Sequence, residues 1–226
     1  MYDLGLEKSA IQWLASQKVN ITVVPFNFTR YPAYVSNLKE YRWKPLVIAE
    51  ALKNFSAFWY FDTSVTVRPV KDDGIQTVQK YCQSHSIPYL LFPHRDRQTT
   101  SPKASIEEGT SIFAATNKQM YDYFPAPTSK TKSVSMFNGG LAFINGASSV
   151  KNHVLRWYVL CALEKDCMGP TGSQLYCNFN KEYRKRYANC HRYDQSAINL
   201  ILAVQNDFNI DRYVYVKDLA LFIERL

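Results

Sequence analysis

The sequence lacks several features that would assign it to a well-known class. No window of the chain approaches the roughly 18 uninterrupted apolar residues of a membrane-spanning helix, and the start, M-Y-D-L-G-L, has neither the basic nor the apolar region of a signal peptide. There is no G-x-x-x-x-G-K-S/T phosphate loop, no G-x-S-x-G nucleophile turn and no H-E-x-x-H zinc helix. These absences argue against P-loop enzymes, serine hydrolases of the α/β type and zinc proteases.

Glycine and proline are scarce, at 8 and 10 of 226 residues, whereas 46% of the residues are hydrophobic and 15% aromatic. This composition is typical of a globular protein, and the length predicts a single domain over residues 1–226. The net charge of +8 suits an acidic partner but is equally compatible with an ordinary solvated surface. The densest basic stretch, Lys181–Arg186, lacks the spaced aromatic residues of an RNA-binding sheet, so we expect no nucleic-acid partner.

Four of the five cysteines gather in one loop-rich stretch, at Cys161, Cys167, Cys177 and Cys190. Their crowding predicts two local disulfides, which form in an oxidising compartment. A zinc site is the alternative, but the spacings include no C-x2-4-C pair, and His191 directly follows Cys190. We therefore favour disulfides over zinc, with the pairing left open.

Three N-x-S/T triplets, at Asn20, Asn27 and Asn54, fit glycosylation in a secretory lumen. Together with the cysteines they indicate the Golgi or ER lumen, or secretion. Because this chain has no export signal, we expect an upstream segment with a membrane anchor, as in a type II membrane protein. Any contact with a membrane would come through that segment, which is absent from this chain.

Apolar runs and helical periodicities alternate along the chain, which favours an α/β fold with a mostly parallel sheet and helices on both faces. The continuous run at 57–61 is typical of a central strand that is buried on both faces. The predicted strands cover 20–26, 57–61, 87–92, 111–115, 141–144 and 213–216. The predicted helices cover 9–14, 45–54, 148–165 and 194–202, with shorter ones through 78–81, capped by Asp72 and Asp73, and after Thr116.

Polar residues follow the predicted strand at 57–61, namely Asp62, Thr63 and Ser64. In open α/β sheets ligands bind beyond the carboxyl ends of the strands, so these residues are candidates for binding a ribose or a divalent cation. An aspartate that only caps a turn is the commoner reading. Arg42 and Lys44 precede the helix that leads into this strand, where they can neutralise a diphosphate or simply lie at the surface.

Two further segments offer groups for binding a sugar. Asn138, Gly139 and Gly140 let a substrate approach the backbone closely, or form an ordinary hairpin turn. The residues at 190–196, C-H-R-Y-D-Q-S, place a cation, a phenol, a carboxylate and an amide at a predicted helix start. Its aspartate, Asp194, can act as a general base for an acceptor hydroxyl or only cap the helix.

Taken in order, five motifs resemble a known family. They are Y-D-L-G-L at 2–6, Y-R-W-K-P-L at 41–46, W-Y-F-D-T-S at 59–64, N-G-G at 138–140 and C-H-R-Y-D-Q-S at 190–196. Together they resemble an uncharacterised animal glycosyltransferase-like family that is abundant in nematodes. More distantly, the chain is similar to the glycogenin-type transferases of the GT-A fold.

This resemblance implies a GT-A domain that lacks its first strand-helix unit and moves a hexose-type sugar from a nucleotide-diphosphate sugar to a glycan or glycoprotein acceptor. In the glycogenin-type transferases the strand-end motif is D-x-D, and its acids help to hold Mn²⁺ on the nucleotide diphosphate. Here Asp62 matches the first acid of that motif, and Ser64 stands at the position of the second. The resemblance places Asp194 and Gln195 in catalysis, with Arg42, Lys44, Asp62, Thr63, Ser64, Asn138, Gly139 and Gly140 at the donor and His191, Arg192 and Tyr193 at the acceptor. The alternative function is an inactive, transferase-derived module that binds a glycan or a nucleotide.

Overall fold

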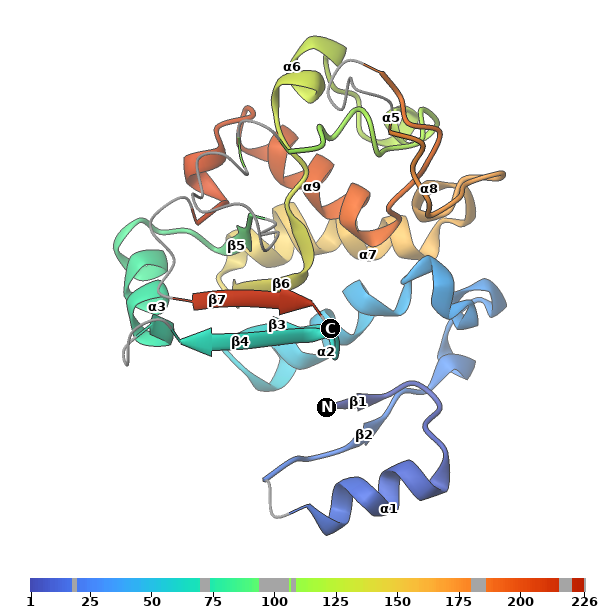
Figure 1. Ribbon diagram of the computed structural model, residues 1–226, viewed down its shortest axis with the longest axis vertical. Helices are drawn as coiled ribbons and strands as arrows, with labels where there is room; N and C mark the ends of the chain where they lie inside the picture. Colours follow the sequence, from blue (N-terminus) through green and yellow to red (C-terminus); the bar gives the residue numbers. More distant parts are fainter. Residues whose placement is uncertain are drawn as a thin grey trace.

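The protein, described here from a computed structural model, has a small antiparallel sheet between helices (Figure 1). The structure describes residues 1–17, 20–69, 74–93, 106, 109–179, 186–215 and 221–225. The central sheet has the order β3-β6-β5, with β3 at Ala57–Phe61, β6 at Asn138–Asn145 and β5 at Tyr89–Phe92. The mixed α/β class is confirmed.

Two short strand pairs lie outside this sheet. β1 (Tyr2–Asp3) pairs with β2 (Val24–Pro25) in parallel, and β4 (Val65–Pro69) pairs with β7 (Leu221–Arg225) in the antiparallel sense. The helices of the described residues are α1 (Lys8–Ser16), α2 (Trp43–Asn54), α3 (Gly74–Ser84), α5 (Met120–Tyr123), α6 (Thr128–Ser133), α7 (Arg156–Leu163), α8 (Lys165–Met168) and α9 (Asp194–Gln205). Short 3-10 turns lie at Phe28–Arg30, Ala33–Ser36, Leu38–Glu40 and Ile210–Arg212, and a π-helical segment, Val150–Leu155, leads into α7.

Helices cover both faces of the central sheet, as the alternating pattern predicts. On one face Leu91, Ala142 and Ile144 belong to a large core together with residues of α2, α7 and α9. On the other face Leu90 and Phe143 pack with Val78 of α3. Because successive side chains of a strand point to opposite faces, each strand of this sheet contributes to both cores.

The prediction of a mostly parallel sheet is wrong, because β6 runs antiparallel to both of its neighbours. Asn138, where β6 begins, lies beside Phe92, where β5 ends. The chain therefore leaves the sheet at the end of β5 and returns to it at the same end of the sheet, without the crossover that a parallel pair requires. The intervening segment is long enough to allow either path, and the sequence pattern alone does not distinguish them.

The strand at 57–61 is present, but it is not central. β3 pairs with β6 on one side, and among the described residues no strand pairs with its other edge. Trp59 and Tyr60 are half-buried, and Phe61 is 39% exposed. Its apolar side chains are therefore not all buried inside the sheet, because several of them line a cavity beside the edge of β3 that faces away from β6.

Other predicted elements are shortened. In the stretch 20–26 only Val24–Pro25 is a strand, and 111–115 forms turns with a single bridge, Ser111 to Ser135. At 213–215 the chain makes one parallel bridge, Val214 to Leu91. The predicted caps Asp72 and Asp73, and residue Val216, lie outside the described residues.

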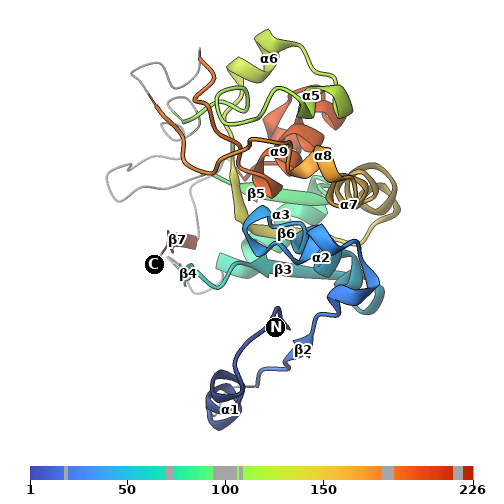
Figure 2. The same ribbon diagram turned by 90° about the vertical axis from the view of Figure 1, so that its right-hand side faces the viewer.

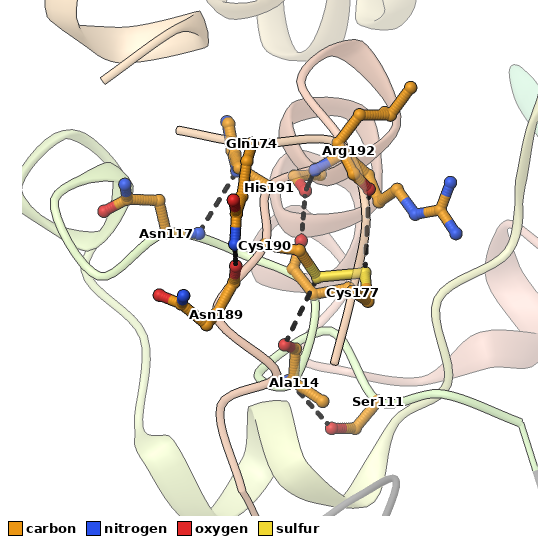
Figure 3. Close-up of a disulfide and its surroundings, with 12 residues drawn as sticks. Ser111, Ala114, Asn117, Gln174, Cys177, Asn189, Cys190, His191 and Arg192 are labelled. Atoms are coloured by element: carbon orange, nitrogen blue, oxygen red, sulfur yellow. Dashed lines mark hydrogen bonds between the residues drawn. A yellow bond between two sulfur atoms is a disulfide. The ribbon is translucent and has the colours of Figure 1, made fainter. Parts of the chain in front are cut away.

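Both predicted disulfides form in the structure. Cys161 bonds to Cys167 (S–S 2.10 Å) and joins the end of α7 to α8. Cys177 bonds to Cys190 (2.07 Å), four residues before α9 begins, and Figure 3 shows this bond against the backbone of Ala114. Asn20, Asn27 and Asn54 are all exposed, and none of the helices in the described ranges is long and apolar enough to cross a membrane. These features are compatible with a lumenal or secreted protein.

The disulfide that closes the longer loop should contribute more stability. Cys177 and Cys190 are 13 residues apart, whereas Cys161 and Cys167 are only 6 apart. Since the entropy that the bond removes from the unfolded chain grows with the logarithm of loop length, replacing both Cys177 and Cys190 by alanine should lower the free energy of unfolding by about 3 kcal/mol. The matched variant with alanine at Cys161 and Cys167 should lose less, as measured by urea denaturation. Equal losses would contradict this reading.

Candidate functional site

A cavity of about 600 Å³ is lined by Phe58–Phe61 of β3 and by the residues that follow the carboxyl end of that strand. One part of its wall is polar, and the rest is lined by apolar and aromatic side chains. The polar lining comprises Lys44, Asp62, Thr63, Ser64, Gly139, Arg192, Asp194 and Gln195. Seven of these eight residues were predicted for the donor site or for catalysis, and they come from four chain segments far apart in sequence. The eighth, Arg192, was predicted for the acceptor.

The centre of the polar wall is Lys44, whose ammonium lies between two carboxylates. Lys44 Nζ is 2.5 Å from Asp194 Oδ2 and 3.2 Å from Asp62 Oδ1, and it also donates to the Gly139 carbonyl at 3.4 Å. The side chains of Lys44 and Asp194 are only 3% and 5% exposed, whereas that of Asp62 is 20% exposed. Asp62 is therefore the carboxylate that a ligand can reach.

Local structure explains why these three groups meet. Lys44 lies in the first turn of α2, Asp194 is the first residue of α9, and Asp62 directly follows β3. The backbone N–H of Asp62 donates to the Gly140 carbonyl at 2.7 Å and extends the ladder between β3 and β6 by one bond. Two helix starts and one strand end thus converge at one edge of the sheet.

The burial of this cluster shifts the pKa values of its members. Burial alone lowers the pKa of Lys44, but the two carboxylates more than offset it, so the pKa is raised. Burial raises the pKa of Asp194. The Lys44 ammonium lowers this pKa and the Asp62 carboxylate raises it, and the net result is a raised pKa. With Lys44 charged, two carboxylates face one cation, and the cluster carries one surplus negative charge when both are ionised.

Tyrosines surround the cluster. The Tyr60 hydroxyl donates to Asp62 Oδ1 at 2.8 Å, and its pKa is raised well above the usual value by burial and by that carboxylate. Tyr158 donates to the backbone carbonyl of Asp194 at 3.2 Å. The rings of Tyr41 and Tyr60 lie 5.2 and 5.6 Å from Lys44 Nζ, within the range of cation–π attraction. Asp62 is thus oriented by a hydroxyl as well as by an ammonium.

Arg42 does not line this cavity. Its side chain is buried and points to the end of α7, where Nη1 donates to the carbonyls of Ala162 and Glu164 and Nη2 to that of Lys165. The carbonyls of Ala162 and Glu164 lie at the C-terminus of α7, where carbonyls lack partners inside the helix, whereas Lys165 is the first residue of α8. The structure therefore assigns Arg42 to capping α7 and leaves Lys44 and Arg192 as the cations of the cavity wall.

The segment Asn138–Gly140 forms the start of β6 rather than a separate turn. Asn138 Oδ1 accepts from the Gly140 N–H at 2.8 Å. A Cβ on Gly139 would lie 3.0 Å from Gln195 Cβ, so glycine lets β6 approach the start of α9 closely. Of the three residues only Gly139 lines the cavity, where its carbonyl faces Lys44.

Residues 191–193 lead into α9, and their side chains have different surroundings. His191 is fully buried; its Nδ1 accepts from the Asn117 N–H at 3.1 Å, which leaves Nε2 to donate to the Met168 carbonyl at 3.0 Å. Tyr193 has a positive φ of 46°, and its hydroxyl donates to the Ser173 carbonyl. Only Arg192 of these three lines the large cavity, so the structure gives His191 a structural position.

Asn199 was missed by sequence reasoning. It is buried in α9, and its Oδ1 accepts from the Phe137 N–H at 2.7 Å while its Nδ2 donates to the Phe137 carbonyl at 3.0 Å. Gln195 donates to the same carbonyl at 2.8 Å. Two amides one turn apart thus fasten α9 to the residue before β6. Their spacing in sequence is the signal that could have identified the pair.

The resemblance implies Mn²⁺ at Asp62, but the residues present do not fit a protein site for this ion. In the described ranges no group of three or more His, Cys, Asp or Glu side chains gathers in one place. The two carboxylates that are close enough both contact Lys44, whose ammonium takes the position between them. Ser64 offers a hydroxyl, which is a weaker ligand for a hard cation than a carboxylate.

Comparison with known proteins covers only the start of the chain. A family model described as "Protein of unknown function (DUF1647)" matches residues 1–49, which include Lys44 but not Asp62 or Asp194. No curated protein and no solved structure matches the chain. The comparison therefore links the first 49 residues to a family without assigning an activity.

Removing the central cation should destabilise the fold. Lys44→Met leaves Asp194 as a buried, uncompensated charge, so we expect the free energy of unfolding to fall by about 3 to 5 kcal/mol at pH 7. The double variant Lys44→Met/Asp194→Asn should recover most of this loss. Urea denaturation measures both, and Lys53→Met, at an exposed position of the same helix, is the matched control. A double variant no more stable than Lys44→Met would contradict the ion pair as the cause.

His191 should make stability depend on pH. Burial lowers its pKa from 6.5 to about 4, so between these values the unfolded chain binds a proton that the folded chain does not. Stability is therefore present above pH 6.5 and is lost as the pH falls toward 4, by roughly 3 kcal/mol for this group. The difference between wild type and His191→Gln in denaturant titrations across this range isolates the effect, with exposed His153→Gln as the control. Parallel profiles for wild type and His191→Gln would refute it.

Proposed function

We propose that this chain is a GT-A-like glycosyltransferase domain that moves a hexose-type sugar from a nucleotide-sugar donor to a glycan or glycoprotein acceptor. The observation that carries the proposal is the cavity at the end of β3, where Asp62 and Lys44 stand side by side. A partly exposed carboxylate and a fixed ammonium suit the two ends of a ribose-diphosphate unit. The proposed setting is the lumen of the Golgi or ER, in line with the two disulfides.

Each part of the wall has a place in this proposal. Asp62 accepts hydrogen bonds from ribose hydroxyls, which are neutral donors and add no charge to the cluster. Lys44 and Arg192 face the diphosphate, whose negative charge increases as the sugar leaves. The aromatic rings of Trp43, Trp59 and Phe61 also line the cavity and provide apolar surface for a base or a sugar ring.

Asp194 holds Lys44 in place in this proposal and is a positioning residue. It is 4% exposed, its Oδ2 is paired with Lys44 at 2.5 Å, and among the described residues that oxygen has no well-aligned hydrogen-bond donor. A carboxylate this deeply buried can hold the Lys44 ammonium in a fixed direction, but it is poorly placed to contact an acceptor hydroxyl. No step of the proposed reaction is assigned to a metal ion.

A second candidate is a binding module that keeps the cavity without turnover. Ser64, which stands where the resembling transferases have a carboxylate, favours this alternative, because a hydroxyl gives a metal-bound diphosphate less support. Both candidates share the same nucleotide pocket, so binding must be tested before turnover.

Nucleotide binding should stabilise the folded chain. In a thermal-shift screen of nucleotide diphosphates and nucleotide sugars, a ligand at 100 times its Kd should raise Tm by about 5 to 10 °C, since it contributes about 2.7 kcal/mol. Asp62→Asn should abolish the rise, because an amide cannot replace the carboxylate at ribose hydroxyls and Lys44. Asp122→Ala, at an exposed position in α5, should retain it.

The same screen with and without Mn²⁺ tests the metal, and release of free nucleotide from the best nucleotide sugar tests turnover. A Tm rise that Asp62→Asn abolishes, together with nucleotide release, is the result expected of a transferase. Binding without release in the presence of glycan acceptors would favour the module. The absence of a shift with any nucleotide, in folded protein, would remove the proposed pocket.

A further inference from the structure

A second, smaller cavity lies beside α8 and has a volume of about 220 Å³. Both views place α8 next to the end of α7, to which a disulfide joins it (Figures 1 and 2). The donor groups of the proposed transferase line the large cavity instead. The small cavity is lined by Tyr34, Glu40, Arg42 and Tyr193 together with residues 165–166 and 169–173.

The small cavity and the large cavity share a wall. In the segment 40–44, Tyr41 lines the large cavity, whereas Glu40 and Arg42 on either side of it line the small one. Around Tyr193 the pattern is reversed, since this residue lines the small cavity and both of its neighbours line the large one. The ring centroids of Tyr41 and Tyr193 are 6.5 Å apart. Ligands in the two cavities would therefore lie close together, near the end of the large cavity that holds Lys44.

An ion pair forms part of the small cavity. Glu40 Oε2 accepts from Arg42 Nε at 2.5 Å, and Glu40 Oε1 accepts from Asn37 Nδ2 at 2.9 Å. A carboxylate has about four acceptor positions, and the Glu40 side chain is 23% exposed, so it can accept further hydrogen bonds from a ligand. A Cβ on Gly169 would lie 2.7 Å from Glu40 Oε2 and from Arg42 Nη2. Glycine at this position therefore leaves the space that the ion pair occupies.

The charges around the small cavity favour a neutral ligand. Its lining includes two carboxylates, Glu40 and Asp166, and two cations, Arg42 and Lys165. The Arg42 guanidinium already donates to Glu40 and to three backbone carbonyls at the end of α7 and the start of α8. An anion would compete with these bonds, whereas the hydroxyl groups of a neutral ligand can donate to the carboxylates without adding charge.

The aromatic part of the lining suits a sugar ring. The Tyr34 hydroxyl donates to the Leu163 carbonyl and the Tyr193 hydroxyl to the Ser173 carbonyl, so both rings are held in place. A sugar has apolar C–H faces, which pack on aromatic rings, and hydroxyl groups at its edge, which bond to polar side chains. The volume lies below the roughly 300 to 1,000 Å³ of pockets for drug-sized ligands. It therefore suits a single sugar ring better than a segment of polypeptide.

We propose that the small cavity binds the neutral sugar at the end of the acceptor glycan. The role of this sugar as acceptor rests on the proposed function, whereas its binding can be tested without turnover. Glu40 accepts hydrogen bonds from the sugar hydroxyls, and the rings of Tyr34 and Tyr193 pack against the sugar. The shared wall places the sugar beside the donor. The proposal also narrows the acceptor from a glycan or glycoprotein to the end of a glycan chain.

The test is an NMR titration of the whole chain with four methyl glycosides, those of glucose, galactose, mannose and N-acetylglucosamine, and with glucuronate as a charged comparison. At least one neutral glycoside should shift the backbone amides of Gly169, Gly172 and Ser173 in a saturable way. A Kd on the order of 1 mM is expected for a ligand of this size. The amides of Thr63 and Ser64 report on the large cavity in the same spectra.

Three variants test the site. Thr171→Trp, at an exposed position in the lining, places an indole in the small cavity and should abolish the shifts. Thr128→Trp, at an exposed position of α6, makes the same substitution elsewhere and should retain them. Glu40→Gln keeps the shape of the side chain but removes its charge, so the Kd should rise by about tenfold. Unchanged amide shifts of β3 and β6 in each variant show that the sheet is folded.

The absence of shifts at the small-cavity amides with all four glycosides would overturn the proposal. Shifts that persist in Thr171→Trp, or that appear only at Thr63 and Ser64, would also overturn it, because the sugar would then bind elsewhere. Tighter binding of glucuronate than of the neutral glycosides would assign the cavity to an anion. Nucleotide binding in the large cavity is measured separately by its effect on Tm, so failure of the donor pocket and failure of this sugar site give different results.

Discussion

The structure depends on one buried interaction, the contact of the Lys44 ammonium with Asp62 and Asp194. These residues start α2, follow β3 and start α9, so the contact fixes two helices and a strand at one edge of the sheet. A buried charge is tolerated only when it is paired, because the low dielectric of the interior makes an isolated ion costly. Of the two carboxylates that pair with Lys44, Asp194 is buried and Asp62 is partly exposed to the cavity.

The order of the strands follows from the path of the chain around this edge. β6 begins beside the end of β5 and runs back between β5 and β3, which brings the Gly139 carbonyl to Lys44. Glycine at this position lets β6 lie against the start of α9, and Asn199 and Gln195 hold the contact from the helix side. The end of the sheet that lines the cavity is therefore formed where β3 ends and the antiparallel β6 begins.

The entry to α9 is reinforced from outside the cavity. The disulfide between Cys177 and Cys190 and the neutral imidazole of His191 precede the helix, and Figure 3 shows both beside Asn117 and Gln174. The Tyr193 backbone, with its positive φ, then turns the chain into Asp194. A strained residue at such a position is maintained by the contacts on either side of it, and here it directs a carboxylate toward Lys44.

Short stretches of the sequence are enough to predict several local elements and the polar character of the site. The apolar run at 57–61, the helix that contains Pro45 and the disulfide cysteines all follow from composition and short spacings, which are properties of neighbouring residues. The sequence also singled out Asp62 and Lys44 as polar groups beside a strand end. These predictions succeed because strand exits, helix starts and cysteine spacing are encoded within a few residues.

The way in which these elements meet depends on contacts between residues that are distant in sequence. The direction of β6 and the open edge of β3 depend on the path of a long connection, which no local pattern encodes. Arg42 and Lys44 are two residues apart, yet one caps α7 and the other lies in the cavity, because side chains two residues apart at a helix start point to different sides of the helix. The role of a charged side chain is set by the distant carbonyls and carboxylates that folding brings to it, and these are absent from its own stretch of sequence.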